Sequence, residues 1–487
     1  MSKPVVFVGP SIQYKDDQID PSFLTSFDIQ PPAKRGDILK AVCLNPSTIV
    51  LIDGLFHEVP SVTHKELLYA LELGICIFGG GSMGALRAVE LEIYGMQPLG
   101  QVAQWYKNGI IDGDDEVAVL HGPKELEYPN LTISLVDIRD YIEKLWKNNL
   151  IKLNQGEQLI SALKAEFYKD RTKHRILKIA KDIGGKLLVD PLSNLIDSYS
   201  LKQNDAILTM KSALNGRNIS KTKQIKTIPN TVYLNYYKER YLPAPGKTAD
   251  FDGPSIQETA WCFQLLHDES KDYIRLVRWR SILALAMKIK GEIADSKVVT
   301  RVYDDLELTM KKQSWKLQLP KSEIKAEANI RSLALSAKEV FGSELNAALF
   351  LIKYYGLPNN EDPITTLIET VEQQYDFLNG WTILRSYVFE PTFSKARRLS
   401  IEVRRLGKQF NKESFGKRII RNSLMNQAAK IWNIDSTLVI SEGAKRGLFL
   451  AVGLFECLSF VVPAIKLADS VFDSAYQDLL SFRKCDQ

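Results

Sequence analysis

One stretch of this sequence restricts the fold more than any other, residues 75–90, which read ICIFGGGSMGALRAVE. A short apolar run leads into three glycines and a serine, and helix-forming residues follow, so the stretch predicts a strand, a sharp turn and a helix over residues 83–91. Gly80, Ser82 and Gly84 have the spacing Gly-x-Ser-x-Gly, in which the turn exposes a serine hydroxyl and glycines flank it because a Cβ would clash. The free N–H groups of the first helical turn attract an anion. Three interpretations stay open on this spacing: a nucleophilic serine, a phosphate-binding loop and a closely packed structural turn.

The region around this stretch alternates between apolar runs and helical patterns. Residues 5–8, 26–30, 48–52 and 75–78 are predicted strands, and residues 37–44 and 63–73 are predicted helices. Such alternation predicts a parallel sheet with helices on its faces, and the functional crevice of such a sheet lies at the carboxyl ends of its strands. Ser11, Asp53 and Ser82 each follow a predicted strand. We therefore expect these three side chains to converge at one edge of the sheet.

Residues 111–122, which read IDGDDEVAVLHG, form an acidic run. Asp112, Asp114, Asp115 and Glu116, together with His121, are residue types that bind metal ions, but the glycine and the distal glutamate are out of register for a calcium loop. Acidic residues are also favoured in the first turn of a helix by its dipole. The run therefore indicates either a charged helix start or a metal site, and we expect the helix start.

The rest of the chain is predicted to be mostly helical. Helical periodicity covers residues 135–181 and 202–214, and residues 215–255 are polar with Pro and Gly, which is typical of a linker or an extended arm. We therefore predict three parts: an α/β domain over residues 1–214, a linker over 215–255, and a separate α-helical domain over 256–487. A basic stretch at residues 395–421 indicates either an exposed helix face or a docking site for an acidic partner.

Composition narrows the class of protein. A chain of 487 residues is expected to form two or three domains, and its net charge of +5 is too small to indicate a nucleic-acid partner. The five cysteines form no Cys-x-x-Cys pair, so we expect reduced thiols without a metal. The N-terminus does not have the pattern of a signal peptide. The apolar residues 447–465 contain Glu456 and Pro463, which favours a buried helix over a membrane helix. We expect a soluble, cytoplasmic protein with no membrane partner.

Roughly the first 210 residues resemble the TfuA-like family. The residues that carry the resemblance are VVFVGPS at 5–11, PPAKRGD at 31–37, VLIDGLFHEVPSVTHKELLYAL at 50–71, FGGGSMGALRAVELEIYGM at 78–96 and DDEVAVLHG at 114–122. LVDIRD at 135–140 and KQNDAIL at 202–208 resemble later pieces of the same family. The resemblance does not reach residues 256–487, so it implies nothing about their role.

The resemblance implies an activity and partners. TfuA-like proteins act with YcaO enzymes, which replace a peptide backbone oxygen with sulfur. The family implies a Ser–Lys hydrolase that acts on the thiocarboxylate of a ThiS-like sulfur-carrier protein and releases sulfide for the YcaO enzyme, with a precursor peptide as a further partner and no cofactor or metal. On this sequence the resemblance places the serine at Ser82 and the lysine at Lys65.

Physical chemistry adds expectations for the neighbours of this pair. Lys65 lies in the first turn of its predicted helix, where the dipole disfavours an ammonium and lowers the pKa. We expect the backbone N–H groups of Gly81, Met83 and Ser11 to bind an oxyanion or a carboxylate.

The same region holds three residues with supporting roles. Arg87 is expected either to pair with the carrier's terminal charge or to pack against the fold, and Asp53 and His64 are candidate supporting residues. The alternative to a hydrolase is a non-catalytic adaptor that docks the peptide onto the YcaO partner.

Overall fold

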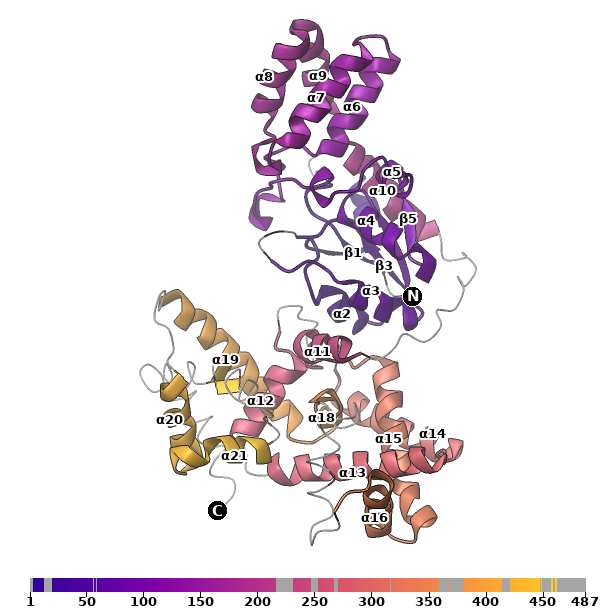
Figure 1. The fold of residues 1–487 in the computed structure, drawn as a ribbon, viewed down its shortest axis with the longest axis vertical. Helices are drawn as coiled ribbons and strands as arrows, with labels where there is room; N and C mark the ends of the chain where they lie inside the picture. The colour runs from indigo at the N-terminus through magenta and orange to yellow at the C-terminus, as the bar shows by residue number, and fades with distance from the viewer. Residues whose placement is uncertain are drawn as a thin grey trace. The chain divides into compact units, whose positions relative to one another are not determined.

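The chain is divided into two units, Met1–Pro229 and Asn230–Gln487, which we call the N-terminal unit and the helical unit (Figure 1). The computed structural model describes residues 3–12, 20–55, 57, 59–215, 231–246, 253–266, 270–315, 317–358, 367, 380–413, 421–446, 448, 457–458 and 460–461. The four cysteines within this part, Cys43, Cys76, Cys262 and Cys457, are free thiols.

A parallel sheet forms the centre of the N-terminal unit, in the strand order β2-β1-β3-β4-β5. Its four predicted strands are present, but β5 was not predicted, because its sequence QPL is short, contains a proline and has no strand pattern. The order places β1 between β2 and β3, so successive strands are added toward one edge from β1 to β2 and toward the other edge from β3 onward. Open α/β sheets bind ligands at such a switch point, here between β1 and β3. The bounds are β1 (Val5–Phe7), β2 (Asp28–Gln30), β3 (Thr48–Leu51), β4 (Cys76–Gly80) and β5 (Gln97–Leu99).

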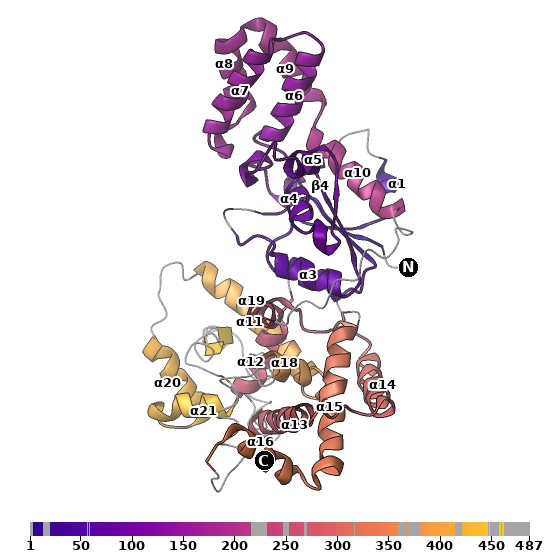
Figure 2. The ribbon, with the colours of Figure 1, turned by 45° about the vertical axis from the view of Figure 1, so that its right-hand side comes forward.

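Helices cover both faces of the sheet, as predicted. The side chains of Val6, Val50 and Phe78 form one apolar face, and α1 (Pro21–Leu24) and α10 (Leu201–Asn215) pack against it. On the other side of the strands lies α4 (Met83–Glu90) (Figure 2). The remaining helices near the sheet are α2 (Asp37–Val42), α3 (His64–Glu72), η1 (Glu92–Tyr94), α5 (Gln101–Lys107), η2 (Asp114–Glu116) and η3 (Lys124–Leu126).

Four helices interrupt the path from the sheet to α10. They pack around an apolar core of their own and extend away from the sheet (Figure 1). The helical periodicity predicted from residue 135 is confirmed, although it continues beyond residue 181. The bundle consists of α6 (Leu135–Lys147), α7 (Leu153–Ala165), α8 (Lys173–Gly184) and α9 (Lys186–Ser198), with η4 (Tyr168–Asp170) between α7 and α8.

The described part of the helical unit has no strand, which confirms the predicted fold class of an α/β domain followed by a mostly helical one. One helix, α11 (Val232–Tyr241), lies within the segment that we predicted as a linker. The helix was not predicted because its tyrosine-rich sequence has little amphipathic pattern. The other helices are α12 (Ile256–Leu266), α13 (Ser270–Lys290), α14 (Ser296–Lys312), α15 (Lys321–Phe341), α16 (Glu344–Tyr355), α18 (Gly380–Tyr387), α19 (Phe393–Glu413), α20 (Arg421–Trp432), η7 (Ser436–Leu438) and α21 (Val439–Lys445).

Charged side chains lie inside the helical unit. Glu323 of α15, which is 4% exposed, pairs with Lys238 of α11 at 2.8 Å and with Arg385 of α18 at 3.4 Å. Arg385 also contacts Glu327, and Arg331 pairs with Glu327 at 2.8 Å. We call these five residues the ionic seam. Because each carboxylate has a cationic partner, the charges are compensated within the apolar surroundings.

Two predicted segments of the helical unit are only partly described. Most of residues 447–465 lies outside the described residues, and none of the helices in the described part of the chain is both long and apolar enough to span a membrane. The basic stretch 395–421 falls largely on α19, where Arg404 pairs with Glu258 and Arg397 donates to the Ala244 carbonyl.

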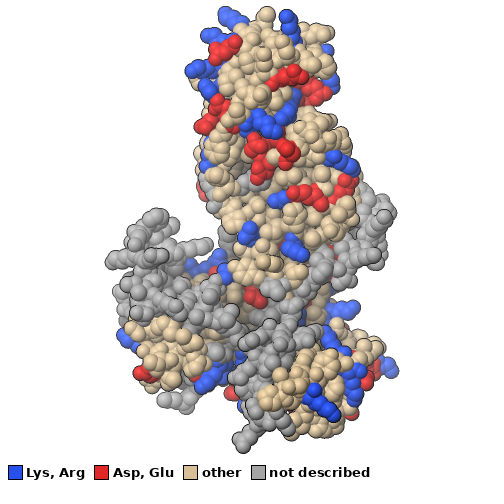
Figure 3. All heavy atoms as spheres, in the orientation of Figure 1, with Lys and Arg blue, Asp and Glu red and all other residues tan. Residues whose placement is uncertain are grey.

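Basic and acidic side chains are interspersed over the N-terminal unit on the face that Figure 3 draws. This mixture agrees with the small net charge of +5. A surface of this kind does not create an extended field of one sign on that face.

Candidate active site

The glycine-rich turn joins β4 to α4 and holds Ser82 at their junction. Gly81 has a φ of +69°, and a Cβ added there would lie 3.0 Å from the carbonyl oxygen of Lys202. A Cβ at Gly84 would lie 1.7 Å from the carbonyl oxygen of Leu51. These two glycines therefore allow α10 to contact the turn and α4 to contact β3 more closely than any other residue would permit.

Ser82 is the N-cap residue of α4, but its hydroxyl makes no capping hydrogen bond. Serine is common at N-caps because its side chain usually accepts from the N2 or N3 amide. Here the Ala85 N–H donates to the Ser82 carbonyl oxygen instead, at 2.9 Å. The hydroxyl is therefore not used to cap α4, and Ser82 lines a cavity.

Ser82 lines a small cavity of about 160 Å³ at the carboxyl edge of the sheet. Its walls come from the segments that follow β1, β3 and β4, from the segment after η2, from η4 and from the first turn of α10. The predicted convergence is thus present for Asp53 and Ser82, which both line the cavity. The lining residues are Pro10, Asp53, Gly54, Leu55, Val59, Ser82, Val117, Ala118, Val119, Leu120, His121, Tyr168, Lys169 and Lys202.

Asp53 joins the end of β3 to the end of β1. Its Oδ2 atom accepts hydrogen bonds from the N–H groups of Gly9 and Ser11, both at 2.9 Å, and its Oδ1 atom accepts from the Ser11 hydroxyl at 2.6 Å. Both the N–H group and the hydroxyl of Ser11 therefore donate to the Asp53 carboxylate. Our expectation that the Ser11 N–H would bind an oxyanion does not fit this arrangement, because that N–H already has an acceptor.

Lys202, in the first turn of α10, lines the same cavity as Ser82 and is only 3% exposed. Its Nζ donates to the carbonyl oxygen of Val117 at 2.8 Å. Burial lowers the pKa of the Lys202 amine, while the carboxylates of Asp53 and Asp137 act in the opposite direction. A buried amine with a lowered pKa that lines the same cavity as a serine has the chemistry that the base of a Ser–Lys pair requires.

Sequence reasoning missed Lys202. The residue opens the segment KQNDAIL, which we quoted for the family resemblance, yet no motif spacing connected it to Ser82. The available signal was its place at the start of a helix within a family-like segment, and that signal does not distinguish a site residue from a surface residue.

The structure does not bring Lys65 to the cavity. Lys65 lies half-buried in the first turn of α3, as predicted, but the lysines that line the cavity with Ser82 are Lys169 and Lys202. The capping box that begins α3 is present, with the Glu66 carboxylate accepting from the Thr63 N–H at 3.2 Å.

His64 and Arg87 share one carboxylate away from the cavity lining. The His64 Nε2 atom contacts Glu90 at 2.9 Å, Arg87 pairs with the same carboxylate, and the Arg87 Nε donates to the Val62 carbonyl oxygen at 3.3 Å. These contacts connect the start of α3 to α4. Of the two roles expected for Arg87, packing against the fold is the one that the contacts favour.

The first N–H group of α4 is available to an anion. The Gly84 N–H donates to the Ile52 carbonyl oxygen at 3.0 Å. No described residue accepts from the Met83 N–H, which lies directly after Ser82 at the positive end of the helix. The expected oxyanion role of Met83 therefore fits the geometry, whereas Gly81 serves to shape the turn.

The acidic run anchors one wall of the cavity. Glu116, which is fully buried, accepts from the Arg139 guanidinium through two hydrogen bonds of 2.8 Å. Asp115 pairs with Arg171 at 2.7 Å. The run starts the short helix η2, in agreement with the expected helix start, and the described residues include no group of three His, Cys, Asp or Glu side chains that could hold a metal.

Arg171 links the wall after η2 to the one formed by η4. Its side chain is 1% exposed, and besides Asp115 it donates to the carbonyl oxygens of Leu163 and Glu166. Val117 follows η2 directly and Tyr168 begins η4, and both line the cavity. Arg171 thus fixes two loops that enclose Ser82.

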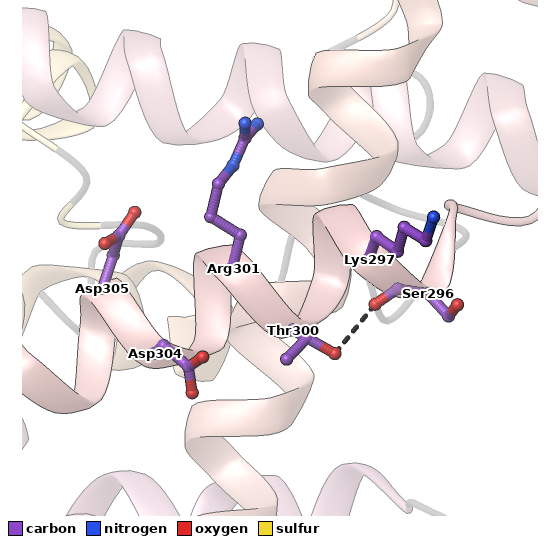
Figure 4. Close-up of a pocket in the computed structure, with 6 residues that line it drawn as sticks. All are labelled: Ser296, Lys297, Thr300, Arg301, Asp304 and Asp305. Atoms are coloured by element: carbon purple, nitrogen blue, oxygen red, sulfur yellow. Dashed lines mark hydrogen bonds between the residues drawn. The ribbon is translucent and has the colours of Figure 1, made fainter.

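A second hollow lies in the helical unit. Figure 4 shows the six residues that line it, Ser296, Lys297, Thr300, Arg301, Asp304 and Asp305, all of which belong to α14. The hydrogen bond drawn there runs from the Thr300 hydroxyl to the Ser296 carbonyl oxygen, within the helix. Because one helix supplies every side chain, no groups converge from different elements as they do at Ser82.

Comparison with known proteins supports the family resemblance over part of the chain. A search of curated proteins gave no match. Residues 53–172 match the model of a family described as TfuA-like protein. The matched segment includes Asp53, Ser82, Arg171 and the wall after η2, whereas Lys202 lies beyond it. The N-terminal unit therefore contains a TfuA-like segment, residues 53–172, which supplies most of the cavity around Ser82.

Proposed function

We propose that the N-terminal unit is a serine hydrolase that cleaves the C-terminal thiocarboxylate of a ThiS-like sulfur-carrier protein and supplies sulfide to a YcaO-family enzyme for peptide thioamidation. The observation that supports hydrolysis is the placement of Ser82 and the buried Lys202 in one cavity. The substrate and the partner enzyme are proposed from the TfuA-like match.

The proposed reaction has two steps. In the first, neutral Lys202 accepts the Ser82 proton while the serine oxygen attacks the carbonyl carbon, and the Met83 N–H stabilises the oxyanion. The carbon–sulfur bond then breaks, the sulfur takes the proton from Lys202, and hydrosulfide leaves. In the second step water cleaves the ester, which regenerates the Ser82 hydroxyl and releases the carrier carboxylate with one proton.

The assignment of the general base revises the one made from the resemblance. Lys65 was the lysine that the family pattern indicated, and it stays a proposal that mutation tests. We favour Lys202 because it lines the cavity with Ser82 and because burial lowers its pKa, which increases the neutral fraction that a base requires.

A non-catalytic adaptor is the second candidate function. The close approaches at Gly81 and Gly84 account for the glycine-rich turn by packing alone. If the unit only docks a peptide onto the YcaO enzyme, Ser82 and Lys202 are dispensable for thioamidation, whereas a hydrolase needs both.

Sulfide release tests the proposal. The full chain is mixed with a thiocarboxylated ThiS-like carrier, and initial rates of sulfide production are compared for wild type, Ser82→Ala, Lys202→Met and the matched Lys65→Met. We expect Ser82→Ala and Lys202→Met to lower kcat by at least about 100-fold, the range in which general acid–base catalysis contributes, and Lys65→Met to leave it within about threefold. Equal rates for wild type and Ser82→Ala would exclude the hydrolase.

A further inference from the structure

Three aromatic rings meet beside the cavity that Ser82 lines. The His57 ring lies 5.9 Å from the Phe167 ring and 6.3 Å from the Tyr168 ring, and the last two are 4.7 Å apart, all between centroids. Tyr168 lines the cavity, and Phe167 is 50% exposed. His57 lies in the loop that also supplies the lining residues Leu55 and Val59. We call His57, Phe167 and Tyr168 the aromatic rim.

The backbone of the rim is unusual at His57. Its φ is +68°, in the left-handed region that residues with a side chain seldom adopt. Its ring is nevertheless exposed, so burial of the side chain does not explain the conformation. Backbone strain of this kind is concentrated at binding and catalytic sites, where it is part of the arrangement of groups.

The size of the cavity limits what it can enclose. Its volume of about 160 Å³ is similar to that of a cavity that holds one benzene molecule and is well below the roughly 300 Å³ at which drug-sized sites begin. Only the acyl end of a substrate fits beside Ser82. A protein substrate must therefore lay the residues before its C-terminus across the surface next to the cavity, and the aromatic rim is located there.

We propose that the aromatic rim binds the extended C-terminal tail of the protein whose acyl end enters the cavity. This inference rests on the proposed hydrolase function and deepens it by assigning the surface that selects the substrate. Rings provide a large contact area with few rotatable bonds, so they bind an extended backbone at a small entropic cost. The ring of Phe167, which is 50% exposed, gains contact area when a tail covers it.

Product binding provides a test that needs no hydrolysis. Affinity is measured by titration calorimetry between the full chain carrying Ser82→Ala and a ThiS-like carrier that ends in an ordinary carboxylate. On that background we expect Phe167→Ala to raise Kd about tenfold, since truncated aromatic anchors commonly have effects of this size. Phe167→Tyr keeps the ring and should leave Kd within about twofold of the starting value, which also controls for folding.

Two further controls identify the site of binding. Leu150→Ala removes a side chain that is 53% exposed in the connection between α6 and α7, and it should leave Kd unchanged. A carrier that lacks its last four residues should show no measurable binding. An unchanged Kd for Phe167→Ala, or full affinity of the shortened carrier, would overturn the inference.

The outcome is separable from that of the proposed function. If the wild-type protein releases no sulfide but the carrier binds through its tail and Phe167, the hydrolase proposal fails and the docking inference holds. If sulfide is released while Kd is independent of the rim, the hydrolase stands and the docking inference fails.

Discussion

Replacing Gly84 by alanine tests how the turn around Ser82 is built. In an unobstructed helix this change would stabilise the fold by about 1 kcal/mol, because glycine is a poor helix former. At this position the new Cβ would lie 1.7 Å from the Leu51 carbonyl oxygen, whereas ordinary contacts begin at 3.4 Å. The obstacle is the backbone of β3 and no rotamer change removes it, so α4 and β3 must separate locally by about 1.7 Å.

The cost of this separation has two parts. Overpacking of a closely packed site costs about 1–3 kcal/mol, and loss of the hydrogen bond from the Gly84 N–H to the Ile52 carbonyl oxygen costs about 1 kcal/mol more. After the gain in helix propensity, we expect Gly84→Ala to lower the free energy of unfolding by about 1–3 kcal/mol. In a unit of this size that corresponds to a fall in Tm of about 2–12 °C.

The same displacement moves Ser82, the proposed nucleophile, which lies two residues earlier. A shift of about 1 Å at a reacting group lowers rates about 100-fold, so Gly84→Ala should reduce kcat for sulfide release by that factor even at temperatures where the protein stays folded. Thermal unfolding by calorimetry and initial-rate measurements at 20 °C below Tm check the two effects. A Tm equal to or above that of wild type would refute the packing argument.

Three further substitutions test other parts of the account. Burial raises the pKa of Glu66 to about 7 from 4.5, so the unfolded chain releases this proton at lower pH than the folded chain does. The free energy of unfolding therefore falls by about 3 kcal/mol as pH rises from 4.5 to 7. Glu66→Gln should flatten that part of the curve of Tm against pH, and parallel curves for wild type and variant would contradict this. Arg171→Met leaves the carbonyl oxygens of Leu163 and Asp115 without this donor and should lower the free energy of unfolding by about 1–3 kcal/mol, measured by calorimetry, with an unchanged Tm as the contrary result. Arg385→Met removes one of the two cations that contact each of Glu323 and Glu327 inside the helical unit and should destabilise that unit by about 1–3 kcal/mol in urea unfolding, whereas a loss below about 0.5 kcal/mol would show that the ionic seam contributes little.

Much of the N-terminal fold could be predicted because its signals are local. Apolar runs bounded by turn residues identified four of the strands, and the helical pattern of residues 63–73 identified α3. Parallel topology then placed Asp53 and Ser82 at one edge, since the carboxyl ends of parallel strands share that edge. Periodicity gave no signal for β5, which is too short.

The partners of charged residues could not be predicted in the same way. Lys202 lines the same cavity as Ser82 only because the chain passes through the four-helix bundle and returns to the sheet as α10, and no sequence pattern encodes that return. The acidic run showed its charge but not its partners Arg139 and Arg171, which come from later segments. These long-range ion pairs are what make the run an anchor for one wall of the cavity.

The most direct test of the central claim is the reactivity of Ser82 toward a small fluorophosphonate, which modifies serines that a neighbouring base activates. The account predicts that mass spectrometry will find the label on Ser82 in the wild-type full chain and in Lys65→Met, and that Lys202→Met will lose it while keeping the wild-type Tm within a few degrees. Absence of label from Ser82, or loss of label in Lys65→Met with retention in Lys202→Met, would contradict a nucleophile activated by Lys202.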